Sequence, residues 1–117
     1  MTAPYLPIFQ VNIPVRMSQA ALTTSVVTLY TTPSNVRTNM QDIIIANTTG
    51  GALTCNLFVV PSTNTAGTAN AILYGFSIGA NTSYHWTGTQ ILFSGDTIQA
   101  QASATGLTIS ISGQQAT

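Results

Sequence analysis

Apolar and polar residues alternate along much of this chain, and a period of two is typical of β-strands with one buried face. The clearest case lies between residues 98 and 112, where apolar residues occupy every second position on both sides of a turn at residues 104–106. Because alternate side chains of a strand point to opposite faces, this pattern predicts a hairpin with one buried and one solvated face. The residues expected to face inward are Ile98, Ala100, Ala102, Leu107, Ile109 and Ile111.

A second turn signal divides the most apolar part of the sequence. Residues 43–45 are three isoleucines, residues 53–60 are mostly apolar, and a Gly-Gly pair at residues 50–51 lies between them. Glycines next to asparagine and threonine favour a tight turn, so this stretch predicts a second antiparallel hairpin around which the chain folds. Phe58 and Val60 make its outer face apolar too. Such a ribbon either lies between two packed layers or presents its outer face to another chain.

Further short strands are expected on both sides of this ribbon, with a long polar loop at residues 62–70. The additional segments are residues 25–30, 71–78, 82–87 and 90–93. No segment carries the apolar stripe of an amphipathic helix. The sequence therefore predicts an all-β fold, an antiparallel β-sandwich that is a jelly roll of about eight strands. We expect one sandwich domain over residues 21–117 and an extended N-terminal arm over residues 1–20.

The first 20 residues combine three prolines with many apolar side chains. Proline removes a backbone donor, and the apolar side chains would be exposed on a free tail, so they need a surface to cover. Two alternatives remain open: an edge strand of the same sheet followed by a loop, or an arm that lies across a neighbouring subunit. In the second case the contact residues are Tyr5, Leu6, Ile8, Phe9, Val11, Ile13, Val15 and Arg16.

Charged residues are unusually scarce, at 3% of the chain, whereas an ordinary domain has about 25%. They are Arg16, Arg37, Asp42 and Asp96. A free monomer normally keeps a mixed, charged surface, so we expect this surface to be covered by copies of the chain or by a larger assembly. Two arginines are too few to neutralise a nucleic-acid backbone or to hold an anionic membrane. We therefore predict neither nucleic acid nor a membrane as a partner.

The sequence offers little catalytic or metal-binding chemistry. One histidine and one cysteine are too few for a zinc site, and no phosphate-binding loop or nucleophile motif is present. Asp42 and Asp96 are the only carboxylate pair for glycosidase chemistry. However, Asp96 follows glycine in a turn, where aspartate bonds the local backbone, and Asp42 could pair with an arginine. Cys55 is expected to be a buried small hydrophobe and His85 a surface or interface residue. We predict no enzyme, no metal and no cofactor.

Tyr84 and Trp86 form the one constellation that could bind a ligand. They share one face of a predicted strand, with His85 on the opposite face and with Tyr74 and Asn81 nearby in the sequence. Aromatic platforms with amides hold neutral sugars by stacking and hydrogen bonding, so Tyr84 and Trp86 are possible glycan contacts. The alternative is that both rings form the core face of their strand.

Five strand-and-turn segments resemble small β-sandwich structural proteins of tailed bacteriophages, which include capsid cement or decoration subunits and tail or neck accessory proteins. They include Ile-Ile-Ile-Ala-Asn at residues 43–47 and Phe-Ser-Gly-Asp-Thr-Ile at residues 93–98. The others are residues 29–35, 57–61 and 109–113. The resemblance spans about residues 22–113 and contains no active-site motif, so no functional residue is carried over.

The resemblance implies a virion structural protein, and more narrowly a capsid cement or decoration subunit that stabilises the phage head by lattice contacts. The implied partners are other copies of the chain, as a homotrimer, and the phage major capsid protein. The implied location is the virion, assembled in the host cytoplasm. Two alternatives remain: a tail, neck or fibre accessory protein with the same fold, or a host-glycan-binding attachment module.

Overall fold

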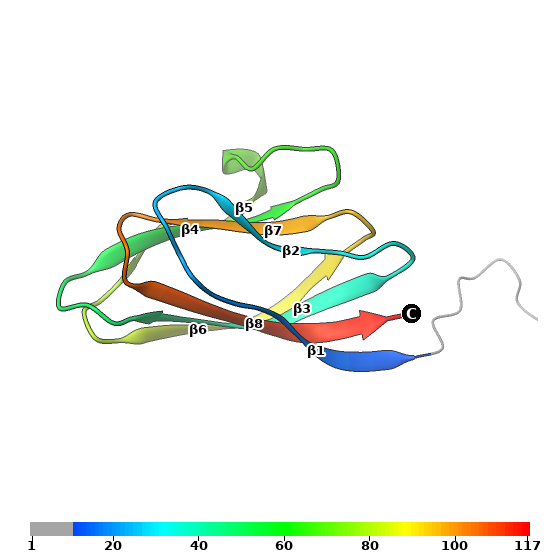
Figure 1. Ribbon diagram of the computed structural model, residues 1–117, viewed down its shortest axis with the longest axis horizontal. Coiled ribbons are helices and arrows are strands. Elements are labelled where there is room, and N and C mark those ends of the chain that lie inside the picture. The colour runs from blue at the N-terminus through cyan, green and yellow to red at the C-terminus, as the bar shows by residue number, and fades with distance from the viewer. Residues whose placement is uncertain (1–10) are drawn as a thin grey trace, which may run out of the picture.

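The structure, a computed structural model, describes residues 11–117 as two packed β-sheets (Figure 1). The eight strands are β1 (Asn12–Ala21), β2 (Val27–Thr31), β3 (Arg37–Asn47), β4 (Leu53–Val60), β5 (Ala71–Ile78), β6 (Ser83–Leu92), β7 (Thr97–Ala102) and β8 (Leu107–Ala116). The single turn of 3₁₀ helix η1 (Thr68–Asn70) precedes β5. The described residues contain no long apolar helix of the kind that crosses a membrane.

Strand order identifies the architecture. One sheet has the order β1-β8-β3-β6 and the other has the order β2-β7-β4-β5, with every pair antiparallel. Among these eight strands, β4 and β5 are the only neighbours in sequence that are also neighbours in a sheet. The connections between the other consecutive strands cross from one sheet to the other (Figure 1). This nested antiparallel order is that of a jelly roll, so the predicted fold is confirmed.

Both predicted hairpins are wrong, although the faces of their strands were assigned correctly. The strands on either side of the Gly-Gly pair are β3 and β4, which lie in opposite sheets, and β7 and β8 are separated in the same way. A short turn can return the chain within one sheet or carry it to the other, and alternation reveals which face is buried but not which strand is the partner. Ile98 and Leu107, for example, are fully buried from opposite sheets.

Apolar side chains from the two inner faces meet in one core. The sheet containing β3 and β8 contributes Met40, Ile43, Ile45, Leu92, Leu107, Ile109 and Ile111, and the opposite sheet contributes Leu57, Ile98 and Ala100, each at most 1% exposed. The core also contains Cys55, which is 2% exposed, as the alternation predicted. Removal of this apolar surface from water is the main force that holds the two layers together.

The outer face of β4 is covered by the chain itself. Phe58 and Val60 are only 4% and 1% exposed, yet they are not part of the central core cluster. In the strand register they are paired with Gln99 and Thr97 of β7, whereas the inward-facing residues of β7 are Ile98 and Ala100. The loop at residues 61–70 and η1 lie over this face, and η1 contacts β4 (Figure 1). The loop therefore covers the outer face of β4, whereas the outer face of β3 stays open, with Ile44 44% exposed.

The predicted boundary at residue 20 lies inside the sandwich. β1 is an edge strand paired with β8 from Asn12 to Ala21, and Met17 and Leu22 are buried in the core. For residues 12–20 the edge-strand alternative is therefore correct. Val15, Met17 and Ala20 pack on the core of their own domain, whereas Ile13 stays 47% exposed. Residues 1–10 lie outside the described residues.

The sheet containing β1 has two β-bulges at the same position along its strands, one in β1 and one in β3. Met17 in β1 and Gln41 in β3 are extra residues opposite β8, so two β-bulges flank Ser112 and Gly113 on both sides. Bulges of this kind bend a sheet and increase its twist. At this bend the carbonyl of Asn39 approaches Gly113 so closely that an added Cβ would lie 2.0 Å from the Asn39 oxygen.

Asn47, the last residue of β3, joins the two sheets. Its side chain is 3% exposed and donates to the carbonyls of Gly51, at 2.9 Å, and of Ile78, at 3.0 Å. Its Oδ1 accepts hydrogen bonds from the backbone N–H of Thr49, at 2.9 Å, and from the Thr49 hydroxyl, at 2.7 Å. One amide thus fixes the crossing from β3 to β4 and ties it to the end of β5.

We expect Asn47→Ala to lower the free energy of unfolding by about 2–4 kcal/mol, because it leaves several buried groups without hydrogen bonds. Denaturant unfolding followed by Trp86 fluorescence would measure this change. Asn64→Ala in the exposed loop is the matched control and should change stability by less than about 0.5 kcal/mol. Equal effects of the two substitutions would contradict the assigned role of Asn47.

We expect Gly113→Ala to cost about 3 kcal/mol or more, because a backbone carbonyl occupies the position of the new methyl group. Gly51→Ala is the control, since an added Cβ there meets nothing within 4 Å. Thermal unfolding of both variants would show a large decrease in Tm for the first and a small change for the second. A Gly113→Ala protein as stable as the parent would show that the bulges do not constrain this position.

Candidate assembly surfaces

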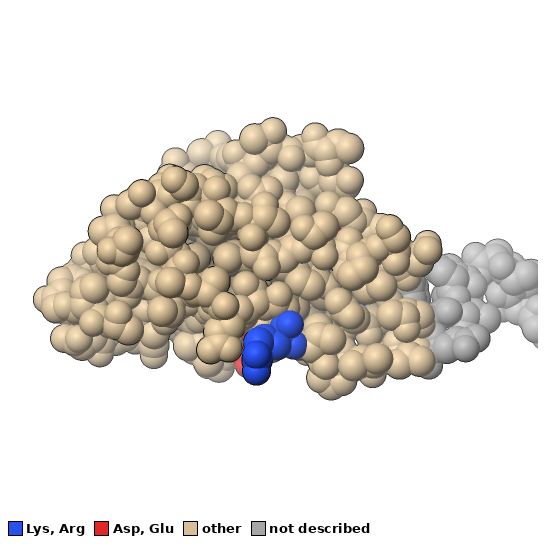
Figure 2. Space-filling view, in the orientation of Figure 1, with Lys and Arg blue, Asp and Glu red and all other residues tan. Residues whose placement is uncertain are grey.

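Three ionisable side chains, those of Arg16, Asp42 and His85, lie on the outer face of the sheet β1-β8-β3-β6. Arg16 and Asp42 both lie opposite Ser112 in the strand register, and the carboxylate of Asp42 pairs with the imidazole of His85. Figure 2 shows basic atoms with an acidic atom beside them on a face that is otherwise free of charged side chains. His85 is 54% exposed, which confirms its expected place at the surface. The partner of Asp42 shown here is thus a histidine, whereas the sequence suggested an arginine.

The second aspartate has a structural role. The two carboxylate oxygens of Asp96 accept hydrogen bonds from the backbone N–H groups of Phe93 and Ser62, both at 2.9 Å. The expected local backbone bonding is therefore confirmed, and it also joins the β6–β7 turn to the loop after β4. Asp96 is thus engaged by backbone groups of a turn, whereas Asp42 lies on β3 and pairs with His85.

Redox and metal chemistry find little support among the described residues. Burial raises the pKa of the Cys55 thiol to about 11, so this group stays protonated over the physiological range. A protonated, buried thiol is a poor nucleophile and a poor metal ligand. No group of three His, Cys, Asp or Glu side chains occurs within residues 11–117.

The predicted contact residues of the N-terminal segment divide into three groups. Tyr5, Leu6, Ile8 and Phe9 lie outside the described residues. Val11 and Ile13 are 46% and 47% exposed at the start of β1. Val15 packs partly against the core, and Arg16 is exposed on the outer face of the sheet. Only the second and third groups can therefore be placed, and Val15 serves mainly the fold.

Val11 and Ile13 lie at the same end of the sandwich as two other exposed apolar side chains, an arrangement that the sequence did not reveal. Asn12 is opposite Ala116 in β8, which is opposite Arg37 in β3, and the same end of the sheet carries the end of β6. Ile91 and Phe93 are 44% and 54% exposed there. We call Val11, Ile13, Ile91 and Phe93 the terminal apolar surface, which consists of two patches at opposite edges of this sheet, because β8 and β3 lie between β1 and β6. A weak signal existed, since Ile91 and Phe93 share one face of the strand predicted at residues 90–93.

Arg37 lies at the same end of the sheet and contacts the aromatic ring of Phe93. Its guanidinium carbon is 4.8 Å from the centre of the Phe93 ring, which is a cation–π distance. Phe93 itself is fixed in the β6–β7 turn by the hydrogen bond from its N–H to Asp96. The ring is therefore held in an exposed position by two interactions, which reduces the entropy lost when a partner covers it.

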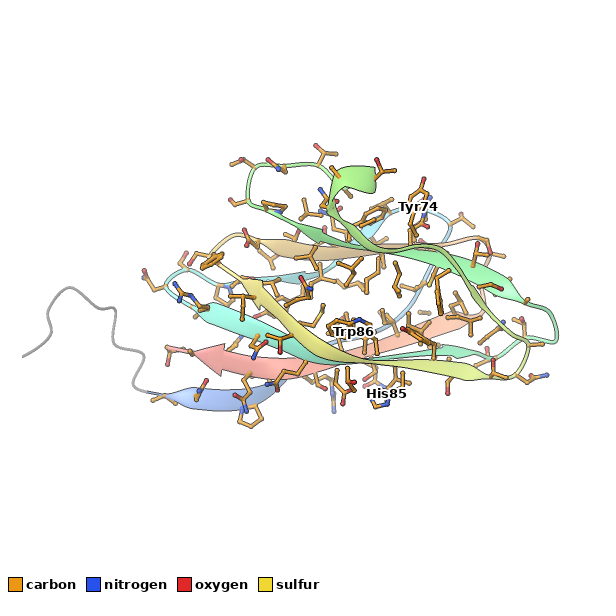
Figure 3. All side chains as sticks on the ribbon, turned by 180° about the vertical axis from the view of Figure 1, so that it is seen from behind. Tyr74, His85 and Trp86 are labelled. Atoms are coloured by element: carbon orange, nitrogen blue, oxygen red, sulfur yellow. The ribbon has the colours of Figure 1, made fainter. Side chains whose placement is uncertain are left out.

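The aromatic constellation is only partly assembled. Tyr84 and Trp86 point inward from β6 and pack against the core, with the Tyr84 and Phe76 rings 4.4 Å apart. Figure 3 shows Trp86 between the sheets, His85 on the opposite side of β6, and Tyr74 pointing away from the other sheet. The two rings are half buried, in line with the core alternative, and the described side chains place Tyr74 elsewhere. A glycan contact at Tyr84 and Trp86 stays a prediction.

Two shallow polar hollows lie on the outer faces of the sheets. The larger, about 460 Å³, lies at the bulges beside Arg16 and Ser112. The smaller, about 310 Å³, contains Asn56 and Gln101, whose side chains bond each other at 3.3 Å. Gln101 also donates to the carbonyl of Thr24 at 2.8 Å. The polar groups of the smaller hollow therefore largely satisfy one another.

Comparison with known proteins supports the fold and no closer relationship. No protein-family model matches this sequence, and no curated protein matches it either. In structure, the chain is similar to a chain of the T13 IBDV viral particle, with a TM-score of 0.53 and 9% identity over 90% of this chain. Structures of the Gx and Gt strains of infectious bursal disease virus are similar with TM-scores of 0.43, identities of 9% and 8%, and coverage of 89% and 91% of this chain. This chain spans about 30% of the length of those viral chains. At this identity the likeness shows a shared jelly-roll fold.

Proposed function

We propose that this chain is a virion structural protein, and specifically a capsid cement or decoration subunit that stabilises a phage head by lattice contacts. The observation that carries the proposal is a jelly roll whose surface is almost uncharged. Charged side chains make up 3% of the sequence, and the outer faces of both sheets present hydroxyl and amide groups in their place. The likeness of the fold to a chain of a viral particle supports the same proposal.

The surface composition favours permanent contact over free diffusion. A dispersed protein relies on charge repulsion and on strongly hydrated side chains to avoid association, and this chain has four charged residues for that purpose. A subunit fixed in a shell has no such requirement. Exposed apolar residues at one end then provide the driving force for attachment, with a rim of hydroxyls and amides that bond across the interface.

The terminal apolar surface is the contact that we assign to the lattice. It includes Val11, which directly follows the apolar and proline-rich residues 1–10 in the sequence. We propose that this end joins copies of the chain into a homotrimer and holds the trimer on the phage major capsid protein. Where three capsomers meet, a trimer presents the same surface to each of them.

We expect deletion of residues 1–10 to leave a folded sandwich that binds capsids at least tenfold more weakly. The deletion stops before β1, because Met17 and Leu22 belong to the core. Circular dichroism would check the fold, and cosedimentation with capsids assembled without this chain would measure binding. A Val11→Ser/Ile13→Ser variant is the matched test of the described part of this surface. Full decoration by the truncated protein would overturn the arm contact.

We expect binding to capsids to change less than about threefold between about 0.05 and 0.5 M salt, since an interface without ion pairs is insensitive to screening. The same cosedimentation assay at several salt concentrations would measure this dependence. A decrease of tenfold or more would show that Arg16, Asp42 or another charge carries the attachment.

Cryo-microscopy of the particle would separate a head location from a tail, neck or fibre location by position and copy number.

A further inference from the structure

β6 is an edge strand whose first half has no protection against pairing with another strand. It is ten residues long, and its only neighbour in the sheet is β3. It contains no proline and none of the four charged residues. Residues 83–87 are paired with β3 in unbroken register, and the irregularity of the strand begins beyond them, opposite Gln41. Its outer edge therefore offers regular, unpaired backbone groups to another strand.

The other three edges carry features that discourage pairing. β1 contains Pro14 and a bulge at Met17, and it lies close to β2. β2 has five residues and a register shift of its own. β5 bends at Gly75, whose φ is +60° and whose N–H is bonded to the side chain of Asn56 at 2.7 Å. Prolines, bulges and short strands are the usual devices that prevent edge-to-edge association.

The inner side of the same edge is apolar and incompletely covered. Tyr84 and Trp86 point into the sandwich from β6 but are only half buried, because no strand lies beyond them, and Phe76 lies half buried beside Tyr84. Figure 3 shows β6 in front of the sandwich with Trp86 behind it. The Trp86 indole also covers Gly88, where an added Cβ would lie 2.9 Å from the ring. An added strand would bury these rings further.

We propose that two copies of this chain pair through β6, antiparallel and about a twofold axis, to form one continuous eight-stranded sheet. A second copy is the fitting occupant because β6 contains no Asp, Glu, Lys or Arg, so no lysine, arginine or carboxylate side chains of the two strands are brought together. Each edge also supplies both backbone groups and aromatic rings. The register centred on His85 places Tyr84 of one copy opposite Trp86 of the other. It also places Ser83 opposite Thr87, with both on the outer face.

This contact is independent of the decoration role, and it lies on a different part of the molecule from the terminal apolar surface. A twofold contact at β6 requires an assembly with an even number of copies, whereas the homotrimer proposed above is odd. If both contacts form, the assembly is a hexamer of two trimers. The number of copies in solution therefore tests the two proposals separately.

The test is a pair of double variants of the full chain that differ only in the sign of one charge. Ser83 and Thr87 are both exposed. Ser83→Lys/Thr87→Lys places lysine opposite lysine twice across the proposed axis, and Ser83→Asp/Thr87→Lys places aspartate opposite lysine twice. Native mass spectrometry and light scattering would give the masses, and circular dichroism would confirm that both variants fold.

We expect an even number of copies for the parent chain and for the Asp/Lys variant, and half that mass for the Lys/Lys variant. A parent that is a monomer or a trimer would overturn the β6 contact and leave the decoration role standing. A Lys/Lys variant with the mass of the parent would also overturn it. If the Asp/Lys variant dissociates as readily as the Lys/Lys variant, the register centred on His85 is wrong.

Discussion

Contact between the inner faces of two sheets is the constraint on which the rest of this structure depends. The side chains that fill the core come from strands far apart in sequence, such as Ile43 in β3 and Ile98 in β7. Neither sheet can bury its apolar face alone, so the two must form together. The connections that carry the chain from one sheet to the other are therefore as important to the fold as the strands themselves.

Polar groups at the two ends of the sandwich hold those connections in place. At one end, Asn47 bonds the β3–β4 crossing and the end of β5. At the other, the Tyr30 hydroxyl of β2 bonds Thr38 of β3 at 2.8 Å and accepts from Gln115 of β8 at 2.7 Å, which links the sheets directly. Each of these bonds replaces one that would otherwise go to water, so their value lies in fixing one arrangement of loops on a core that is not itself directional.

The sequence revealed the faces of the strands and the fold class, but not the partners of the strands. Alternation at residues 98–112 depends on local geometry alone, which is why the buried residues were predicted correctly. Pairing of β3 with β6 and β8 depends on the whole chain, and the Gly-Gly turn after β3 carries no information about it. The terminal apolar surface was missed for the same reason, since Val11 and Phe93 reach the same end of the sheet only through the pairing of β1, β8, β3 and β6. The sequence did not show that residue 113 must be glycine. That requirement comes from the close approach of the Asn39 carbonyl, at a position set by bulges on two other strands.

On a surface with almost no charge, an unprotected sheet edge is free to pair with a strand of another chain. In a dispersed protein, an uncharged ten-residue edge strand such as β6 is a site of uncontrolled association, and selection normally adds a lysine or a proline to it. Here Pro14 and Gly75 supply such devices on β1 and β5, whereas residues 83–87 of β6 have a regular, uninterrupted register and no proline. The same contrast holds for the ends of the sandwich, since Phe93 is fixed in an exposed position by Arg37 and Asp96 while most large apolar side chains of the strands are buried. Tyr74 on β5 and Ile44 on β3 are exposed as well. On a surface with so little charge, exposed apolar side chains are the groups that favour association most, because hydroxyls and amides bind water about as well as they bind protein.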